Sequence, residues 1–124
     1  MKIYKTKEFA RLACKERVDD LKLCEALARA DRGLLDATLG KFLIKQRVAR
    51  PNEGRSGGYR TIVFYQQTTR AVFLHLFAKN DKGNLTNDEL AAYRDLAKHL
   101  AELTAQQVKM LLDHGKWLEI ERDK

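Results

Sequence analysis

Residues 44–60 read IKQRVARPNEGRSGGYR and are the most informative stretch of the chain. Residues 42–49 are predicted to form a β-strand. Residues 51–58, PNEGRSGG, hold three glycines and the only proline of the chain, a composition typical of a turn. The β-branched and aromatic residues 59–66 predict a second strand. The stretch therefore predicts a β-hairpin.

The hairpin and the residues after it carry the positive charge of the protein. Residues 41–60 contain six Lys or Arg residues and a single acid, Glu53. Residues 41–82 hold nine basic and two acidic side chains, a net of +7, which equals the +7 of the whole 124-residue chain. A localised positive field attracts polyanions. The distribution favours a nucleic acid or acidic partner over a purely solubilising surface.

The residues on either side of the hairpin predict further strands and helices. Upstream we expect a short strand at residues 3–4, a helix from Thr6 to about Arg17, a second helix from Asp19 or Asp20, and an ambiguous segment at 34–41 with room for an edge strand. Downstream we expect a central strand at 71–78 (AVFLHLFA), helices opened by capping boxes at Thr86-x-x-Glu89 and Thr104-x-x-Gln107, and a strand or anchoring tail at 117–120.

Together these elements predict a single α+β domain over residues 1–124. Its central antiparallel sheet consists of a three-strand meander plus a short edge strand. The sheet is expected to pack against an N-terminal helix pair and C-terminal helices on one face and to be basic on the other.

Several classes of protein are disfavoured by what the sequence lacks. Cys14 and Cys24 lack the close spacing and companion His of a metal site, and we expect both to be buried residues of a reduced protein. A signal peptide, a lipidation signal and an apolar run of membrane-spanning length are missing. We therefore predict a cytoplasmic protein with no metal, no cofactor and no membrane partner.

The cations suit chemistry on a phosphodiester. Lys45 and Arg47 lie two apart on one strand and so share a face, while Arg60 opens the next strand. Lys79 and Lys82 follow the third strand beside the same sheet. In RNA the adjacent 2′-OH is a built-in nucleophile, and Lys and Arg can stabilise the charge of the transition state. A phosphate-binding or partner-binding patch without catalysis fits the spacing equally well.

Aromatic residues near the cations have two interpretations. His75 alternates with Phe73 and Phe77, so we interpret it as a core or sheet-face residue rather than a catalytic one. Tyr59 borders the basic turn and either belongs to the core or stacks on a base.

Two motifs, GRSGGYR at residues 54–60 and FAKN at 77–80, are fairly specific as a pair. With KTKEF at 5–9 and LTAQQ at 103–107, they resemble the RelE-like toxins of type II toxin–antitoxin systems, most closely the HigB-like branch. The similarity covers nearly the whole chain. One departure is that Leu85 stands where some members place a tyrosine, while Tyr93 is expected in the core.

The resemblance implies a RelE-like fold and a small toxin that enters the ribosomal A site and cleaves mRNA. The implied reaction is a metal-independent 2′-OH attack that leaves a 2′,3′-cyclic phosphate and a 5′-OH. The implied partner is a helix-turn-helix antitoxin, with operator DNA bound only through that antitoxin. Combined with the charge pattern, the resemblance implies catalytic roles for Arg60, Lys45, Arg47 and Lys79, and RNA-binding roles for Lys41, Arg50, Arg55, Tyr59 and Lys82.

Two other functions are compatible with the same fold. A ParE-like inhibitor of DNA gyrase would act by binding protein and would not need the strand cations. A non-catalytic module would bind RNA or a partner without cleaving it.

Overall fold

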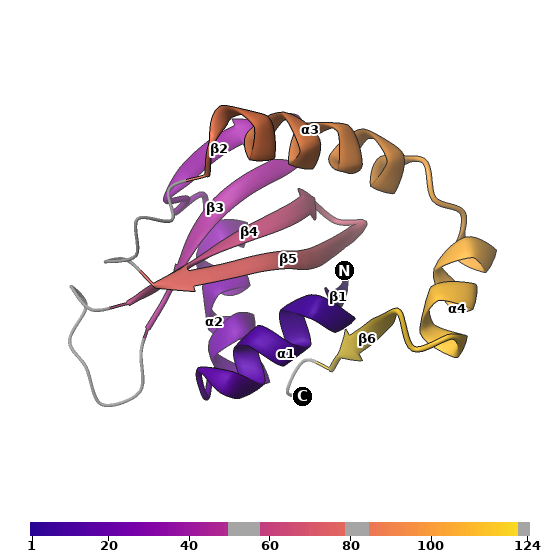
Figure 1. The fold of residues 1–124 in the computed structure, drawn as a ribbon, viewed down its shortest axis with the longest axis horizontal. Coiled ribbons are helices and arrows are strands. Elements are labelled where there is room, and N and C mark those ends of the chain that lie inside the picture. The colour runs from indigo at the N-terminus through magenta and orange to yellow at the C-terminus, as the bar shows by residue number, and fades with distance from the viewer. Residues whose placement is uncertain (50–57, 79–84, 122–124) are drawn as a thin grey trace.

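The structure, a computed structural model, describes residues 1–49, 58–78 and 85–121 (Figure 1). In chain order its elements are β1 (Lys2–Thr6), α1 (Lys7–Lys15), α2 (Asp20–Asp31), β2 (Ala37–Gly40), β3 (Leu43–Val48), β4 (Tyr59–Gln66), β5 (Arg70–Ala78), α3 (Asn87–Ala101), α4 (Ala105–Asp113) and β6 (Trp117–Ile120). The predicted turn lies outside the described residues except for Gly58.

One six-stranded sheet, in the order β2-β3-β4-β5-β1-β6, forms the centre of the molecule. Strands β2 to β5 follow one another as antiparallel neighbours, which confirms the predicted meander and its edge strand. Strand β1 lies parallel to β5, and β6 pairs antiparallel with β1. The C-terminal segment at 117–120 is therefore a strand of the sheet.

Side-chain caps define the beginnings of all four helices named above. Thr6 and Asp19 accept hydrogen bonds from the backbone N–H groups of Phe9 and Lys22, each at 3.1 Å. Both predicted capping boxes are formed, Thr86 with Glu89 and Thr104 with Gln107. Each N-cap side chain contributes about 1 kcal/mol by satisfying an N–H group that the helix leaves unpaired.

Helices cover both faces of the sheet, which corrects the expectation of one covered and one open basic face. Helices α1 and α2 lie on one face, against β5 and β3 respectively, and α3 lies on the other against β2, β3 and β4 (Figure 1). Arg94 of α3 donates from Nε to the carbonyl oxygen of Leu39 at 2.6 Å, which ties the helix to the β2 edge. The only open part of the α3 face is the part that α3 does not cover.

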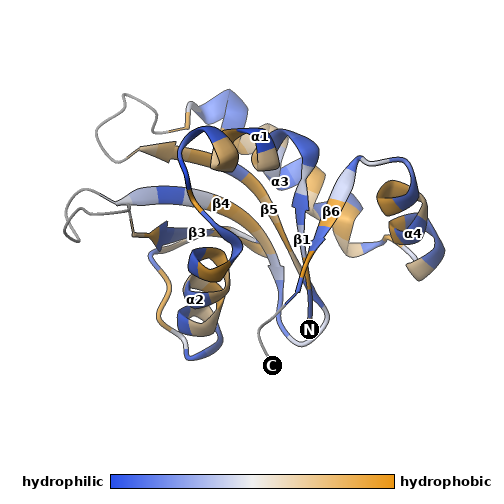
Figure 2. Cartoon of the chain, turned by 90° about the horizontal axis from the view of Figure 1, so that it is seen from below, coloured by the Kyte–Doolittle hydropathy of each residue, from blue (hydrophilic) through white to orange (hydrophobic). Residues whose placement is uncertain are grey.

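Each face of the sheet has its own apolar core, because successive strand residues point to opposite sides. On the α1/α2 face the phenyl rings of Phe9 and Phe73 meet at 5.2 Å between centroids. On the α3 face Phe64 and Val72 pack with Ala97, Leu100 and neighbouring side chains. Strand β5 serves both cores and is hydrophobic along most of its length (Figure 2).

Cys14 is exposed on α1, contrary to the expected burial, because it lies on the face of the helix turned away from Phe9 and Ala13. Cys24 on α2 is partly buried. Among the described residues, no group of three or more His, Cys, Asp or Glu side chains is placed to hold a metal ion. Within those same ranges no helix combines the length and apolar character needed to cross a membrane.

Candidate functional site

Three predicted cations meet on the α3 face of the sheet. Arg47 of β3 lies directly opposite Arg60 of β4, and Lys45 lies opposite Ile62 one pair along. Opposed residues of antiparallel strands share a face, so Lys45, Arg47 and Arg60 form one surface, called here the cationic face. Like charges directly opposite each other destabilise a strand pair, so this arrangement favours binding of an anion.

Arg60 is held in place by a carboxylate that the sequence did not point to. Its Nε lies 3.1 Å from Oδ2 of Asp36, and the Arg60 side chain is only 11% exposed. Asp36 precedes β2, so the Arg60 side chain reaches along the face past β3. Nη1 of Arg60 is buried and has no hydrogen-bond partner among the described residues. Asp36 therefore orients the guanidinium at one edge, while the Nη1 donors are left without a partner among the described residues.

A buried amide fixes the position of Asp36. Gln46 is 1% exposed, and its Oε1 accepts from the backbone N–H of Asp36 at 3.0 Å. Its Nε2 donates to the carbonyl oxygens of Ala26 at 2.9 Å and Leu34 at 3.0 Å. The Gln46 side chain of β3 thus links the sheet to α2 and to the segment before β2. These hydrogen bonds fix the position of Asp36, whose carboxylate pairs with Arg60.

A shallow hollow of about 140 Å³ lies beside Lys45 on the same face. Its apolar walls come from β2, β4, β5 and the start of α3, namely Leu39, Ile62, Phe77, Leu85 and Leu90. An ammonium group at the rim of an apolar hollow suits a ligand with both a flat apolar part and a negative charge.

His75 lies half-buried on this face of the sheet, one of the two places that its interpretation as a core or sheet-face residue allowed. Ile62 pairs with His75 whereas Val63 pairs with Phe73, so a β-bulge leaves Leu74 as an extra residue. The bulge turns His75 toward Phe77 and α3. Its ring lies 6.0 Å from that of Phe77 and 6.2 Å from that of Tyr93, both at 27°.

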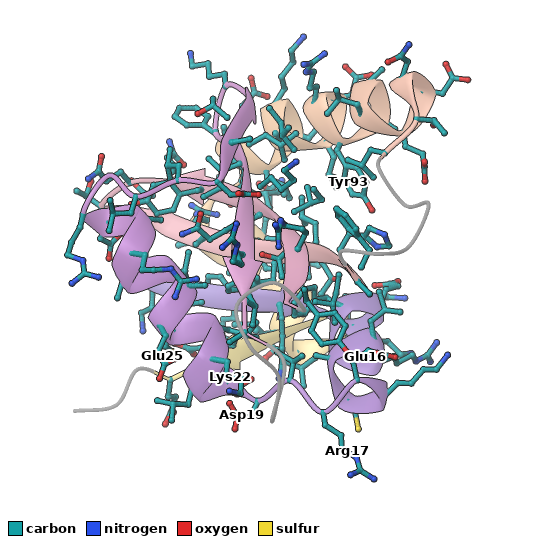
Figure 3. The ribbon with its side chains drawn as sticks, turned by 90° about the vertical axis from the view of Figure 1, so that its left-hand side faces the viewer. Glu16, Arg17, Asp19, Lys22, Glu25 and Tyr93 are labelled. Atoms are coloured by element: carbon teal, nitrogen blue, oxygen red, sulfur yellow. The ribbon has the colours of Figure 1, made fainter. Side chains whose placement is uncertain are left out.

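Tyr93 packs against the core of this face, as expected, and its ring also meets that of His75. It is half-buried, and Figure 3 shows its side chain descending from α3 toward the sheet, far from Glu16 on the α1 side. Sequence reasoning interpreted His75 as a core or sheet-face residue and Tyr93 as a core residue, and it did not bring the two rings together because their contact joins β5 to α3. The one feature of the sequence that pointed to a functional role was His75, a titratable side chain within the otherwise apolar run AVFLHLFA.

The surroundings set the charge of these rings. Burial lowers the pKa of His75, and the nearby Glu89 carboxylate opposes this effect without cancelling it. Burial and Glu89 both raise the pKa of Tyr93. Hydrogen bonds to Thr86 in the capping box lower the pKa of Glu89. At neutral pH the imidazole is therefore largely uncharged, the phenol keeps its proton and Glu89 is ionised.

Two predicted RNA-binding residues do not join the cationic face. Tyr59 lies on the α1/α2 face, is 3% exposed, and donates from its hydroxyl to Oε1 of Glu16 at 2.6 Å, so its ring is core and not a base platform. Lys41 lies before β3, with Nζ 5.3 Å from the centre of the Phe42 ring. Lys41 belongs to the turn that precedes β3, and Arg47 lies four residues beyond Leu43, the first residue of that strand, about 13 Å along it.

Four other predicted residues, Arg50, Arg55, Lys79 and Lys82, lie outside the described residues. The roles inferred for them stay predictions.

The family model described as the RelE toxin of the RelE/RelB toxin–antitoxin system matches residues 1–120. No curated protein matches the chain.

Proposed function

The chain belongs to the RelE toxin family, and on that premise we propose that it is a ribosome-dependent endoribonuclease that cleaves mRNA in the A site. Membership of the family implies an antitoxin as partner. The proposal extends to a helix-turn-helix antitoxin that covers the cationic face or keeps the toxin off the ribosome. Operator DNA would be bound through that antitoxin.

The observation that carries the proposal is the pairing of Arg47 with Arg60 beside Lys45 on one face. Cleavage begins with attack of the 2′-oxygen on the adjacent phosphorus. The transition state carries more negative charge on the non-bridging oxygens than the ground state does. A guanidinium whose direction is already set by Asp36 stabilises that charge without reorganising at the moment of reaction.

The test is primer extension on mRNA from cells expressing the wild type, Arg60→Ala or Arg11→Ala, with translation running or blocked. Arg11 is an exposed cation of α1 on the opposite face, so its variant controls for loss of one positive charge. We expect translation-dependent cuts with the wild type and Arg11→Ala. We expect the cuts to fall by roughly 10²–10³-fold with Arg60→Ala, the usual cost of losing one stabilising donor.

Circular dichroism of each purified variant establishes that it is folded. Full cleavage by folded Arg60→Ala, or cuts that persist when translation is blocked, would contradict the proposal. Growth arrest with DNA damage and no cuts would indicate gyrase inhibition, and RNA binding without cleavage would indicate a binding module.

A further inference from the structure

We infer that His75 is the general base of this cleavage and accepts the proton of the attacking 2′-OH. The inference rests on the proposed function, and it assigns a role in the reaction to a residue outside the predicted catalytic set.

The sheet register places His75 within reach of a phosphate held by the cationic face. Arg60 pairs with Phe77, and His75 is two residues before Phe77 on β5, so Arg60 and His75 are diagonal neighbours. Diagonal neighbours in a sheet are about 7–8 Å apart, a gap that long side chains bridge. The Arg60 guanidinium itself is turned over β3 toward Asp36, so the phosphate is approached from the side of His75 by Lys45, which lies in one row with Ile62 and His75 across β3, β4 and β5. A phosphodiester seated in the hollow lined by Lys45, Ile62 and Phe77 presents its 2′-oxygen to the imidazole.

The β-bulge at Leu74 is what places His75 on the same face as Arg60. In a regular strand, residue 75 would face the same side as Phe73 and pack toward α1. The extra residue instead turns the imidazole onto the face that carries Arg47 and Arg60. Bulges occur next to active sites because they re-aim a single side chain in this way.

Two aromatic rings hold the imidazole in place. The ring of Phe77 lies 6.0 Å and that of Tyr93 6.2 Å from the imidazole between centroids, and each is inclined to it by 27°. Tyr93 comes from α3, which is tied to the β2 edge by Arg94. A base whose ring is restrained in this way loses little freedom when the substrate binds.

The charge state of the ring also fits a base. Burial lowers the pKa of His75, so the imidazole is neutral and able to accept a proton at pH 7. The groups that face it are Glu89 and Tyr93 on α3, Arg60 on β4, and Lys45 and Arg47 on β3. Tyr93 keeps its own proton because its pKa is raised, and Glu89 is engaged in its capping box.

The step balances without a metal or a second reactant. The 2′-oxygen forms a bond to phosphorus as its proton passes to the imidazole, and the bond from phosphorus to the 5′-oxygen breaks. The leaving 5′-oxygen takes a proton from water, and the hydroxide so formed removes the proton from the imidazolium. The products are a 2′,3′-cyclic phosphate and a 5′-OH, with His75 neutral again.

The inference is tested by single-turnover cleavage of mRNA on programmed ribosomes between pH 5.5 and 8.5. The proteins are the wild type, His75→Asn, His75→Ala, Arg60→Ala, and His99→Asn as a matched control. His99 is an exposed histidine of α3 whose Nδ1 is 2.9 Å from the carbonyl oxygen of Asp95. We expect His75→Asn to slow cleavage by about 10²–10⁴-fold, the usual contribution of a general base, and His99→Asn to match the wild type.

The pH profile separates a proton acceptor from a structural ring. A neutral base is lost on protonation, so the wild-type rate falls as the pH drops below the pKa of His75, which lies beneath the ordinary value of about 6.5. This acid limb is absent from the His75 variants. Added imidazole raises the rate of His75→Ala and leaves that of Arg60→Ala unchanged.

The outcomes distinguish this inference from the proposed function. If Arg60→Ala abolishes cleavage while folded His75→Asn stays within threefold of the wild type, the inference is wrong and the nuclease assignment stands. A slow His75→Ala that imidazole does not rescue, with the acid limb intact, assigns the ring a structural role and also overturns the inference. Wild-type protein that leaves programmed mRNA intact at every pH overturns both.

Discussion

The two faces of the sheet use alternate residues of the same strands, yet only one of them carries charged groups between β3 and β5. On the α1/α2 face these strands present apolar side chains together with two fully hydrogen-bonded polar ones, Gln46 and Thr61. On the α3 face, apolar packing occupies the end of the strands near Phe64, and Lys45, Arg47 and Arg60 occupy the other end. The first face stabilises the fold, and half of the second carries the proposed binding site.

This difference is a consequence of which helix residues cover each face. The α1/α2 face is buried by Phe9, Leu23 and Leu27, each fully covered, so a cation there would have no access to solvent. Over the cationic end of the other face, α3 contributes Leu90 and Tyr93, which are only half-buried. Lys45 and Arg47 remain near water there, whereas Arg60 is mostly buried and is compensated by Asp36.

The largest expected effect comes from truncating the same type of ring on each face. Phe73→Ala on the α1/α2 face removes a fully buried ring packed on Phe9, and we expect the free energy of unfolding to fall by about 3–5 kcal/mol. Phe77→Ala on the cationic face removes a half-buried ring and should cost about 1–2 kcal/mol, because less apolar area leaves water there. Urea denaturation followed by circular dichroism measures both. Equal losses would contradict the division between the faces.

A smaller effect, on activity, is expected for Asp36→Asn. The carboxylate orients Arg60 but also cancels part of its charge. Without it we expect about tenfold slower single-turnover cleavage, because the guanidinium is less well positioned, together with tighter ribosome binding, because a polyanion meets one more uncompensated charge. Cleavage and sedimentation assays with the same ribosomes separate the two quantities.

Asp20→Asn is the matched control for this variant. Asp20 pairs with Lys5 at 2.8 Å on the α2 side of the molecule, away from the cationic face. Its variant should leave both quantities unchanged. A faster cleavage rate with Asp36→Asn would show that the carboxylate competes with the substrate phosphate instead of positioning Arg60.

The smallest effect is expected in the β4–β5 turn, at the far end of both strands from the cations. Thr68 has a φ of 70°, a conformation that is costly for a β-branched residue. We expect Thr68→Gly to raise the free energy of unfolding by about 1 kcal/mol without altering cleavage. Thr69→Gly, at a residue without a positive φ, should lower it. A change in cleavage by Thr68→Gly would mean that the turn and the cationic face are coupled.

Local features were predictable because their causes lie within a few residues. The caps at Thr6, Asp19, Thr86 and Thr104 mark helix starts through hydrogen bonds to residues two or three positions along the chain. Strand β4 has the predicted bounds because its composition is β-branched and aromatic throughout. The shared face of Lys45 and Arg47 and the approach of Arg60 followed from strand alternation and hairpin pairing.

Other features depend on partners distant in sequence. Alternation cannot show the bulge at Leu74, which exists only in the pairing of β5 with β4, so the sequence alone did not show that His75 shares a face with Arg60. The contact of Asp36 with Arg60 joins residues 24 positions apart through the amide of Gln46. The burial of Tyr59 depends on α1, which supplies Glu16 as its hydrogen-bond partner.

The sequence by itself determined the α+β class, the antiparallel meander, the helix starts and the concentration of positive charge, because each is set by periodicity, capping or composition over short distances. The tertiary structure decided that β1 enters the sheet between β5 and β6, that α3 covers part of the charged face, and that His75, Tyr93 and Asp36 join the cations. The physical reason is that these contacts are made between elements, where a single extra residue in one strand changes which side chains meet.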